Sequence, residues 1–350
     1  MQLWRLEPLV RQQHEAHQLW GPKLDDAVAW LQSPAVLKDD GPVLSWSNVD
    51  HPGYPYPEAA GLWLAAYPWF LSWGTPDALP ALNQRADRVA QWLCEELSPV
   101  GGVGRDGYDY VFDTAVGLAG LLRYSQARQP AGTVASRVND AITASYGFVQ
   151  RALQDRVAMS PEASSDRWSQ RFGSHQLKCT LALELYANRM GSIPENPASL
   201  TELANGISSV ITESDPVYVH GLCYALEGLA VRTMHRNGSQ DSRIFSLLEQ
   251  LVAMQDPTGG IAAFIHEGRG LGPCRSDATA QLIRLWCLVD PNRYQGPIRS
   301  ALQFLKDMQA PCGGIRYEPG SSDINTWSTL FTVQAVDAYV RGGLRPLELL

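Results

Sequence analysis

Two carboxylates stand at the start of apolar segments and directly after aromatic residues. Glu58 lies in YPYPEAAGLWL and Asp113 lies in YDYVFDTAVG. An acidic side chain in a first helical turn stabilises the helix through its dipole, which is a sufficient local reason for each residue. If the two helices are neighbours, their axes are about 8–10 Å apart. The carboxylates could then reach the separation of roughly 5 to 9.5 Å that acid and base catalysis on a glycosidic bond requires.

A histidine, His220, lies between Tyr218 and Tyr224 at the start of another apolar segment. The ordinary pKa of imidazole suits proton abstraction and suits the binding of a sugar hydroxyl. A hydrogen-bonded core histidine would give the same pattern. His175 holds the equivalent place in a further segment and is a candidate for substrate binding. Tyr110 is an alternative acid or base, because a tyrosine hydroxyl can serve in either role.

Aromatic and cationic side chains gather near the same helix starts. Flat rings suit stacking on sugars, and a cation could pair with a substrate carboxylate, which a uronate lyase or epimerase needs to acidify a carbon-bound proton. Surface solvation is the ordinary alternative for any one cation. The aromatic candidates are Tyr54, Tyr56, Tyr108, Tyr110, Trp168, Tyr218, Tyr317 and Trp327, and the cations are Arg105, Arg171, Lys178 and Arg275.

A repeat of two helices positions these residues. A helix with aromatic or leucine spacing, a glycine-rich turn and a second helix recur in four clear copies, at 27–43, 88–104, 247–262 and 301–316. Apolar periodicity supplies the other pairs. The first helices are predicted at 24–33, 80–97, 133–153, 198–212, 241–254 and 296–309, and the second helices at 57–73, 110–125, 174–190, 217–235, 275–289 and 324–340.

The first helices are amphipathic and the second are apolar nearly all round, which predicts an outer and an inner ring. The sequence therefore predicts an all-α fold, an (α/α)6 toroid of six helical hairpins. Residues 1–350 would form a single domain, with residues 1–22 as an extra N-terminal helix packed on it. All inner helices then run the same way, so their polar N-termini, Asp277 among them, meet at one mouth that can hold a substrate.

The same residues carry a resemblance to a known group of proteins. The motifs are YPE with the following glycine at 56–61, VFDT at 111–114, and H-x-x-x-YALEGL at 220–229. The chain resembles largely uncharacterised bacterial proteins, associated with polysaccharide genes, in the α/α-toroid superfamily of terpenoid cyclases and protein prenyltransferases. It is also similar to the toroid of D-glucuronyl C5-epimerases. The family usually has Asn where this chain has Asp113. It also has an arginine in the third inner helix, where this chain has Lys178.

The resemblance continues with Cys274 and Gln281, and with the N-x-W of Asn325 and Trp327. It implies that Gln281, Asn325 and Trp327 contact a substrate. Relatives in the superfamily hold zinc, and His220 and Cys274 would begin adjacent inner helices. The Asp-x-Cys and Cys-His-Gly arrangements of those relatives are absent, however, and zinc takes three or four well-spaced ligands. We therefore expect no metal and no cofactor.

Composition narrows the partners. The net charge is −8 and no Lys or Arg cluster could follow a phosphate backbone, so nucleic acid is not expected. No apolar run reaches the roughly 18 residues of a membrane span. The charged N-terminal segment does not have the pattern of a signal peptide, so we expect a cytoplasmic protein. The six scattered cysteines are expected to be free thiols. No feature of the sequence indicates an oligomeric state.

Together these features predict a carbohydrate-active enzyme that works in the mouth of the toroid on a small-molecule or glycan substrate. The reaction would be proton abstraction, as in a uronate lyase or C5-epimerase, or glycoside hydrolysis. One alternative is a cyclase of the terpenoid or lanthionine-forming type. Another is a toroid that binds a glycan or peptide without chemistry.

Overall fold

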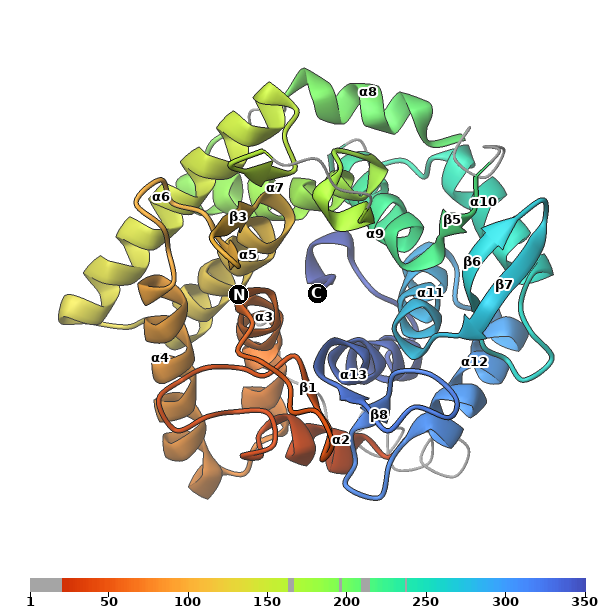
Figure 1. The fold of residues 1–350 in the computed structure, drawn as a ribbon, viewed down its shortest axis with the longest axis horizontal. Coiled ribbons are helices and arrows are strands. Elements are labelled where there is room, and N and C mark those ends of the chain that lie inside the picture. Colours follow the sequence, from red (N-terminus) through yellow and green to blue (C-terminus); the bar gives the residue numbers. More distant parts are fainter. Residues whose placement is uncertain (1–20, 163–166, 195–196, 209–214, 237) are drawn as a thin grey trace.

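Twelve helices in the described part of the chain form two concentric rings, as Figure 1 shows. The computed structural model describes residues 21–162, 167–194, 197–208, 215–236 and 238–350. The outer helices are α2 (Leu24–Leu31), α4 (Leu79–Glu95), α6 (Gly132–Asp155), α8 (Ala198–Gly206), α10 (Ser242–Ala253) and α12 (Gln295–Met308). The inner helices are α3 (Pro57–Trp73), α5 (Val111–Arg128), α7 (Cys179–Met190), α9 (Val219–Ala230), α11 (Ser276–Val289) and α13 (Thr326–Val340). The predicted (α/α)6 toroid is confirmed.

The two rings differ in burial because they differ in apolar pattern. Helix α12 buries only one stripe, which includes Ile298, Leu302 and Leu305, and its opposite face is charged. Every residue of α11, from Ser276 to Val289, is buried, since this helix packs against neighbours on all sides. The polar residues of an inner helix therefore lie inside the molecule, where each needs a partner or a function.

Several boundaries differ from the prediction. The third inner helix begins with a 3-10 segment, Ser174–Lys178, before α7. The fourth ends in a π-helical turn, Val231–His235, after α9. Outer helix α8 ends at Gly206, and part of the predicted range 198–212 lies outside the described residues. The predicted extra N-terminal helix, within residues 1–22, also falls almost wholly outside them.

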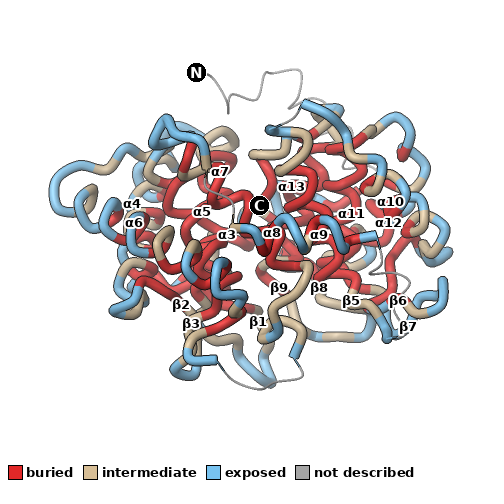
Figure 2. Tube along the Cα trace, turned by 90° about the horizontal axis from the view of Figure 1, so that it is seen from above, coloured by how far each residue is buried: buried red, intermediate tan, exposed pale blue. Residues whose placement is uncertain are grey.

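Short strands, which the sequence analysis did not predict, surround the starts of the inner helices. They form three antiparallel sheets of three strands, in the orders β1-β9-β8, β2-β3-β4 and β5-β6-β7. Figure 2 shows these strands together at one end of the molecule. Their bounds are β1 Trp46–Ser47, β2 Val103–Arg105, β3 Tyr108–Tyr110, β4 Met159–Ser160, β5 Val217–Tyr218, β6 Ala262–His266, β7 Arg269–Cys274, β8 Ile315–Arg316 and β9 Ile324–Asn325.

The glycine-rich turns recognised in the sequence join each repeat to the next. A Cβ atom on Gly41, Gly101 or Gly259 would lie 2.4, 2.5 or 2.0 Å from a backbone oxygen of the following outer helix. Gly313 has a φ of +97°, and its Cβ would lie 2.1 Å from the carbonyl oxygen of Asp26 in α2. Since α2 is the first outer helix, this last contact closes the ring. The pairing of β1 with β9 closes it again at the mouth.

We expect Gly313→Ala to destabilise the protein by at least about 2 kcal/mol. Alanine is strained at a positive φ, and its Cβ would overlap the backbone of α2. The matched control is Gly296→Ala in α12, where a Cβ meets no atom within 4 Å. That change should be neutral or stabilise by up to about 1 kcal/mol. Urea unfolding of both variants checks this. Equal stability would contradict the assigned ring closure.

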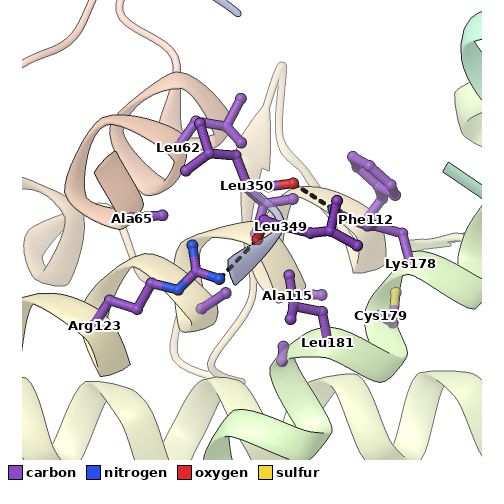
Figure 3. A pocket seen from close by; sticks show the side chains of 13 residues that line it. Leu62, Ala65, Phe112, Ala115, Arg123, Lys178, Cys179, Leu181, Leu349 and Leu350 are labelled. Carbon is purple, nitrogen blue, oxygen red and sulfur yellow. Dashed lines mark hydrogen bonds between the residues drawn. The ribbon is translucent and has the colours of Figure 1, made fainter. Parts of the chain in front are cut away.

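The centre of the ring is filled from the end opposite the strands by the segment that ends at Leu350 (Figure 1). Leu349 and Leu350 are buried. Arg123 of α5 donates hydrogen bonds to the carbonyl oxygens of Leu347 and Leu349, both at 2.7 Å. Lys178 donates to the carbonyl oxygen of Leu350. Figure 3 shows Arg123 and Lys178 around this segment, beside a cavity of about 10 Å³. Such a cavity has room for about one water molecule.

A buried ionic network lies beside the segment that ends at Leu350, which forms the floor of the ring. Glu227 of α9 accepts a hydrogen bond from Lys178 at 2.7 Å and another from Arg284 of α11. Burial acts to raise the pKa of Glu227, but the charges of Arg284 and Lys178 outweigh it and lower that pKa below its ordinary value. Lys178 was one of four cations expected at the rim, any one of which could pair with a substrate carboxylate; its expected place at the rim is wrong, because the side chain is buried. A 3-10 turn precedes its helix, and the Lys178 ammonium group binds Glu227 and the carbonyl oxygen of Leu350.

Candidate active site

Glu58 and Asp113 lie in the first turns of α3 and α5, two adjacent inner helices. Glycines bring these helices unusually close together. A Cβ on Gly61 would lie 2.7 Å from the Gly117 Cα, and a Cβ on Gly120 would lie 2.3 Å from the Gly61 oxygen. Gly61 follows Glu58 by three residues and Gly117 follows Asp113 by four, so each glycine shares its carboxylate's helix face. The close contact therefore draws the two carboxyl groups together, as the sequence analysis expected.

The environment of the pair favours its protonated form. Asp113 is buried, and its Oδ2 has no hydrogen-bond partner among the described residues. Burial and the neighbouring Glu58 carboxylate raise the pKa of Asp113 well above its usual value. Burial also raises the pKa of Glu58 to about 7, against the opposing effect of hydrogen bonds from Tyr56 and Tyr224 and of the Arg105 charge. At neutral pH Glu58 is thus near its midpoint, and Asp113 holds a proton to higher pH than an ordinary aspartate does.

The raised pKa of Glu58 predicts a loss of stability as pH rises. The folded pKa of about 7 exceeds the ordinary glutamate pKa of 4.5, so between these values the folded state binds more protons than the unfolded state. Stability therefore falls through this window. In Glu58→Gln this loss is removed. Relative to wild type, the variant should gain up to about 3 kcal/mol between pH 4.5 and 8. Urea unfolding at a series of pH values measures the difference, and a constant difference would contradict the shift.

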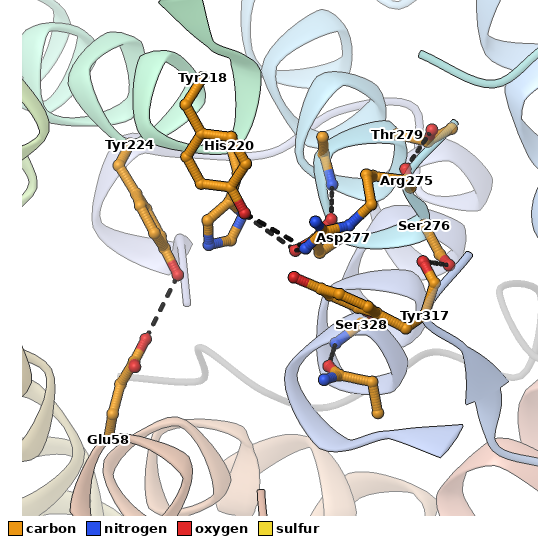
Figure 4. A network of polar contacts seen from close by, with 12 residues as sticks. Glu58, Tyr218, His220, Tyr224, Arg275, Ser276, Asp277, Thr279, Tyr317 and Ser328 are labelled. Atoms are coloured by element: carbon orange, nitrogen blue, oxygen red, sulfur yellow. Dashed lines mark hydrogen bonds and ion pairs between the residues drawn. The ribbon is translucent and has the colours of Figure 1, made fainter. Parts of the chain in front are cut away.

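A second set of polar residues, His220, Arg275 and Asp277, lies across the mouth from Glu58 (Figure 4). The Nδ1 of His220 lies 3.5 Å from Oδ2 of Asp277. Arg275 donates to the same oxygen at 2.9 Å and to the Tyr218 hydroxyl at 3.2 Å. Burial lowers the pKa of His220, although Asp277 acts to raise it. His220 is therefore held as a neutral imidazole beside the Asp277 carboxylate.

Arg275 was expected to meet a substrate carboxylate, but its charge is already matched within the protein. Besides the ion pair to Asp277, its guanidinium lies 3.4 Å from the ring centroid of Tyr317. Burial acts to raise the pKa of Asp277, but His220 and Arg275 outweigh it and lower that pKa below its ordinary value. Arg275 and Asp277 thus form a fixed pair that supports His220, and their predicted contact with substrate stays a prediction.

Tyr224 links the two sides of the mouth. Its hydroxyl donates to Oε1 of Glu58 at 3.4 Å, and its ring centroid lies 4.5 Å from that of His220. Figure 4 shows Glu58, Tyr224 and His220 pointing into the same central space. The sequence analysis used Tyr224 only as a neighbour of His220. Its place one helical turn after His220 was a signal that both side chains share a face.

Arg105 is the cation next to the carboxyl pair. It projects from the β2–β3 hairpin, whose turn residues Asp106 and Gly107 both have positive φ, as in a two-residue hairpin turn. Its guanidinium lies 5.5 and 5.6 Å from the ring centroids of Tyr54 and Tyr56 and donates to the Tyr54 hydroxyl. Its ion pair with Asp106 is long, at 4.0 Å, and that carboxylate is 81% exposed. Arg105 thus lies partly exposed at the mouth, and its charge acts on Glu58 and Asp113.

Aromatic rings line the mouth on both sides of these groups, as expected. Tyr54 and Tyr56 are 5.5 Å apart between centroids, and Trp327 lies 6.2 Å from Tyr56. On the other side Trp168 lies 5.2 Å from Tyr218 and 5.9 Å from His220. The rings meet edge to face or tilted, so they do not cover one another's faces by stacking. Such faces can stack on a sugar ring.

The remaining predicted residues are placed less favourably for direct chemistry. His175 is buried under Trp168, and burial lowers its pKa to about 3, so it is neutral. Tyr110 is buried, and its hydroxyl accepts a hydrogen bond from Gln170 at 2.9 Å. Tyr108 lies partly exposed on the hairpin. Asn325 is buried and caps α13 by accepting a hydrogen bond from the Ser328 amide, which is a structural role.

Gln281 is buried one turn after Asp277, and its amide acts to raise the pKa of His220. Gln281 therefore lies in the inner ring close to His220 and Asp277. No group of three or more His, Cys, Asp and Glu side chains in the described ranges is arranged to hold a metal ion. All six cysteines are free. None of the described helices is long and apolar enough to cross a membrane.

Solved structures of sugar-converting enzymes share this fold. D-mannose isomerase is similar with a TM-score of 0.67 and 12% identity, over 94% of this chain and 97% of that one. Cellobiose 2-epimerase from Bacillus thermoamylovorans B4167 has a TM-score of 0.64 and 11% identity, over 95% and 98%. A glycosidase has a TM-score of 0.58 and 13% identity, over 96% and 97%. No family model and no curated protein sequence matches the chain. At these identities the likeness is one of fold.

Proposed function

We propose that the protein is a carbohydrate-active enzyme that abstracts a proton from a sugar carbon, with a reaction of the epimerase or lyase type. The observation that carries the proposal is the pair of Glu58 and Asp113, two adjacent carboxyl groups of raised pKa that face a mouth lined with aromatic rings. The solved structures of similar fold include an isomerase and an epimerase of sugars, which supports the same class of substrate.

The geometry suggests how the groups divide the work. Glu58, near half ionised at pH 7, takes the proton from a carbon next to a carbonyl or carboxylate group. Arg105 stabilises the negative charge that develops on the enolate oxygen. Return of a proton from water to the opposite face of that carbon, on the side of His220, gives the epimer, and the proton taken by Glu58 passes back to the solvent. Expulsion of a substituent from the next carbon gives the unsaturated product of a lyase instead.

Glycoside hydrolysis is the second candidate, and the same carboxyl pair favours it. A protonated carboxyl and an ionised one can serve as the acid and the base or nucleophile of a glycosidase, and a glycosidase is among the similar structures. The cyclase alternative is not favoured, because the mouth is lined by Glu58, Arg105, His220 and Asp277 as well as by rings. A toroid that only binds a glycan would need no such pair of carboxyl groups with raised pKa values.

Incubation with a panel of aldoses, ketoses, uronic acids and their oligosaccharides in heavy water tests the proposal. Proton abstraction predicts loss of one carbon-bound proton signal in the NMR spectrum, together with an epimer or an unsaturated uronate. Hydrolysis predicts new reducing ends with no deuterium on carbon. Neither change with any free or linked sugar would contradict the proposed class of enzyme.

A further inference from the structure

Tyr224 reaches Glu58 across the full width of the inner ring. It lies on α9, the fourth inner helix, whereas Glu58 lies on α3, the first, and Figure 1 shows these two helices on opposite sides of the ring. The Tyr224 hydroxyl donates a hydrogen bond to Oε1 of Glu58 at 3.4 Å, and Figure 4 shows the two side chains pointing toward each other. One oxygen of the Glu58 carboxyl group is therefore bonded from the far side of the mouth.

Packing against side chains of three inner helices fixes the ring of Tyr224. Its centroid lies 4.6 Å from that of Phe112 on α5, 4.5 Å from that of His220 on α9 and 6.3 Å from that of Phe331 on α13. The side chain is only 1% exposed. A ring enclosed in this way has little room to move, because protein interiors are close-packed. The hydroxyl is therefore a fixed point, and Glu58 keeps the hydrogen bond only when its carboxyl group is turned toward Tyr224.

The same hydrogen bond acts on the ionisation of Glu58. A hydroxyl donates more strongly to a carboxylate than to a neutral carboxyl group, so Tyr224 favours the ionised form of Glu58. This effect opposes burial, which raises the pKa of Glu58 to about 7. A base that abstracts a proton needs both a defined direction and a supply of its ionised form. The contact with Tyr224 supports both.

We propose that Tyr224 is a positioning residue, which holds the Glu58 carboxyl group in the direction that proton abstraction requires. The inference rests on the proposed function and deepens it, because it assigns the orientation of the base to a side chain on the opposite inner helix. Tyr224 itself transfers no proton in this scheme. Burial raises its pKa well above that of an ordinary tyrosine, which keeps the hydroxyl protonated as a donor.

An NMR titration of the Glu58 carboxyl carbon in Tyr224→Phe protein tests the contact without any substrate. Phenylalanine keeps the ring and its packing but has no hydroxyl to donate. Since the lost hydrogen bond favours the ionised form, Glu58 should titrate at higher pH than in the wild type, by about 0.5–1 pH unit. An unchanged or lower titration pH would overturn the inference.

Kinetics separate the orientation of the base from the binding of substrate. On any sugar that the wild type converts, Tyr224→Phe should lower kcat about tenfold and leave KM within about twofold. The acid limb of the kcat/KM profile should move to higher pH, because a base of higher pKa becomes ionised at higher pH. If KM rises and kcat stays unchanged, Tyr224 binds substrate and does not position Glu58.

Tyr124→Phe is the matched control. Tyr124 is also buried on an inner helix, α5, and its hydroxyl donates to a carboxylate, Asp87 of α4, at 2.7 Å. It lies about three turns after Asp113 and thus far from the mouth. This variant loses the same chemical group, but its kinetics and its Glu58 titration should match those of the wild type. Equal changes in the two variants would show a general effect of a lost hydroxyl and would refute the assigned role.

The two proposals fail separately. If the wild type converts a sugar but Tyr224→Phe keeps the wild-type kcat and Glu58 titration, the positioning role is wrong and the proposed function stands. If the Glu58 titration moves as expected in Tyr224→Phe but no sugar is converted by the wild type, the orienting contact stands and the enzymatic function is wrong.

Discussion

Glu58→Gln should lower kcat by about 10²- to 10⁴-fold while the affinity for substrate changes little. Glutamine keeps the size of the side chain and can still accept the hydrogen bond from Tyr224, but it cannot accept a proton. The loss therefore falls on the chemical step, and kcat and kcat/KM should decline together. Steady-state kinetics on any sugar that the wild type converts give the measurement.

The matched control is Glu267→Gln on the turn between β6 and β7, where the carboxylate is 83% exposed. This variant should retain wild-type kinetics. If Glu58→Gln instead raises KM and leaves kcat unchanged, the carboxylate only binds substrate, and the assigned role in proton transfer is wrong.

The largest effect on stability is expected at Glu227. Its carboxylate binds Lys178 at 2.7 Å and also binds Arg284, and all three side chains are at most 4% exposed. Replacement by alanine leaves two buried cations without their counterion, which should destabilise the protein by about 3–5 kcal/mol. Arg284, whose guanidinium lies 4.2 Å from the ring centroid of Phe331, has no other ion pair among the described residues.

Glu249→Ala provides the comparison. Glu249 pairs with Arg293 at 2.8 Å, but the two side chains are 46% and 53% exposed. Exposed pairs of this kind contribute about 0–1 kcal/mol. Urea denaturation of both variants, with far-UV circular dichroism as the signal, gives the two values. A loss at Glu227 no larger than that at Glu249 would contradict the view that this network supports the floor of the ring.

The architecture could be predicted from the sequence because two signals repeat. Apolar residues in α4 and α12 form one stripe, whereas α11 and α13 are apolar nearly all round, and this difference places helices in the outer or inner ring. The phrase of helix and glycine marks Gly41, Gly101, Gly259 and Gly313, and each of these packs on the next outer helix. For most elements the predicted helix boundaries lie within a few residues of those in the structure.

The strands escaped prediction because most are two or three residues long, too short to show alternation. They matter to the site, since β2 and β3 carry Arg105 over the rings of Tyr54 and Tyr56. In the sequence Arg105 was one of four cations near the mouth, and no local pattern separated it from Lys178 or Arg275. Only the fold shows that Lys178 and Arg275 are already paired with Glu227 and Asp277.

The sequence predicts that Glu58 and Asp113 lie on adjacent helices, but it does not predict how strongly their pKa values are raised. Their placement follows from two adjacent helix starts. Their raised pKa values depend on how closely the helices approach at Gly61 and Gly117, and on how little water reaches Asp113. The role of the segment at 344–350 was also invisible, because its short apolar and charged pattern has no period and its partners Arg123 and Lys178 are distant in sequence.

The central claim is that Glu58 and Asp113, two neighbouring carboxyl groups in the mouth, have raised pKa values. The most direct test is a pH titration of side-chain carboxyl carbons by NMR, with Glu58 assigned by comparison with Glu58→Gln. The structure predicts that the Glu58 carboxyl titrates near pH 7 because burial raises its pKa, and that Asp113 titrates at lower pH in Glu58→Gln, which removes the neighbouring negative charge. Titration of Glu58 near pH 4.5 in the wild type would contradict the account.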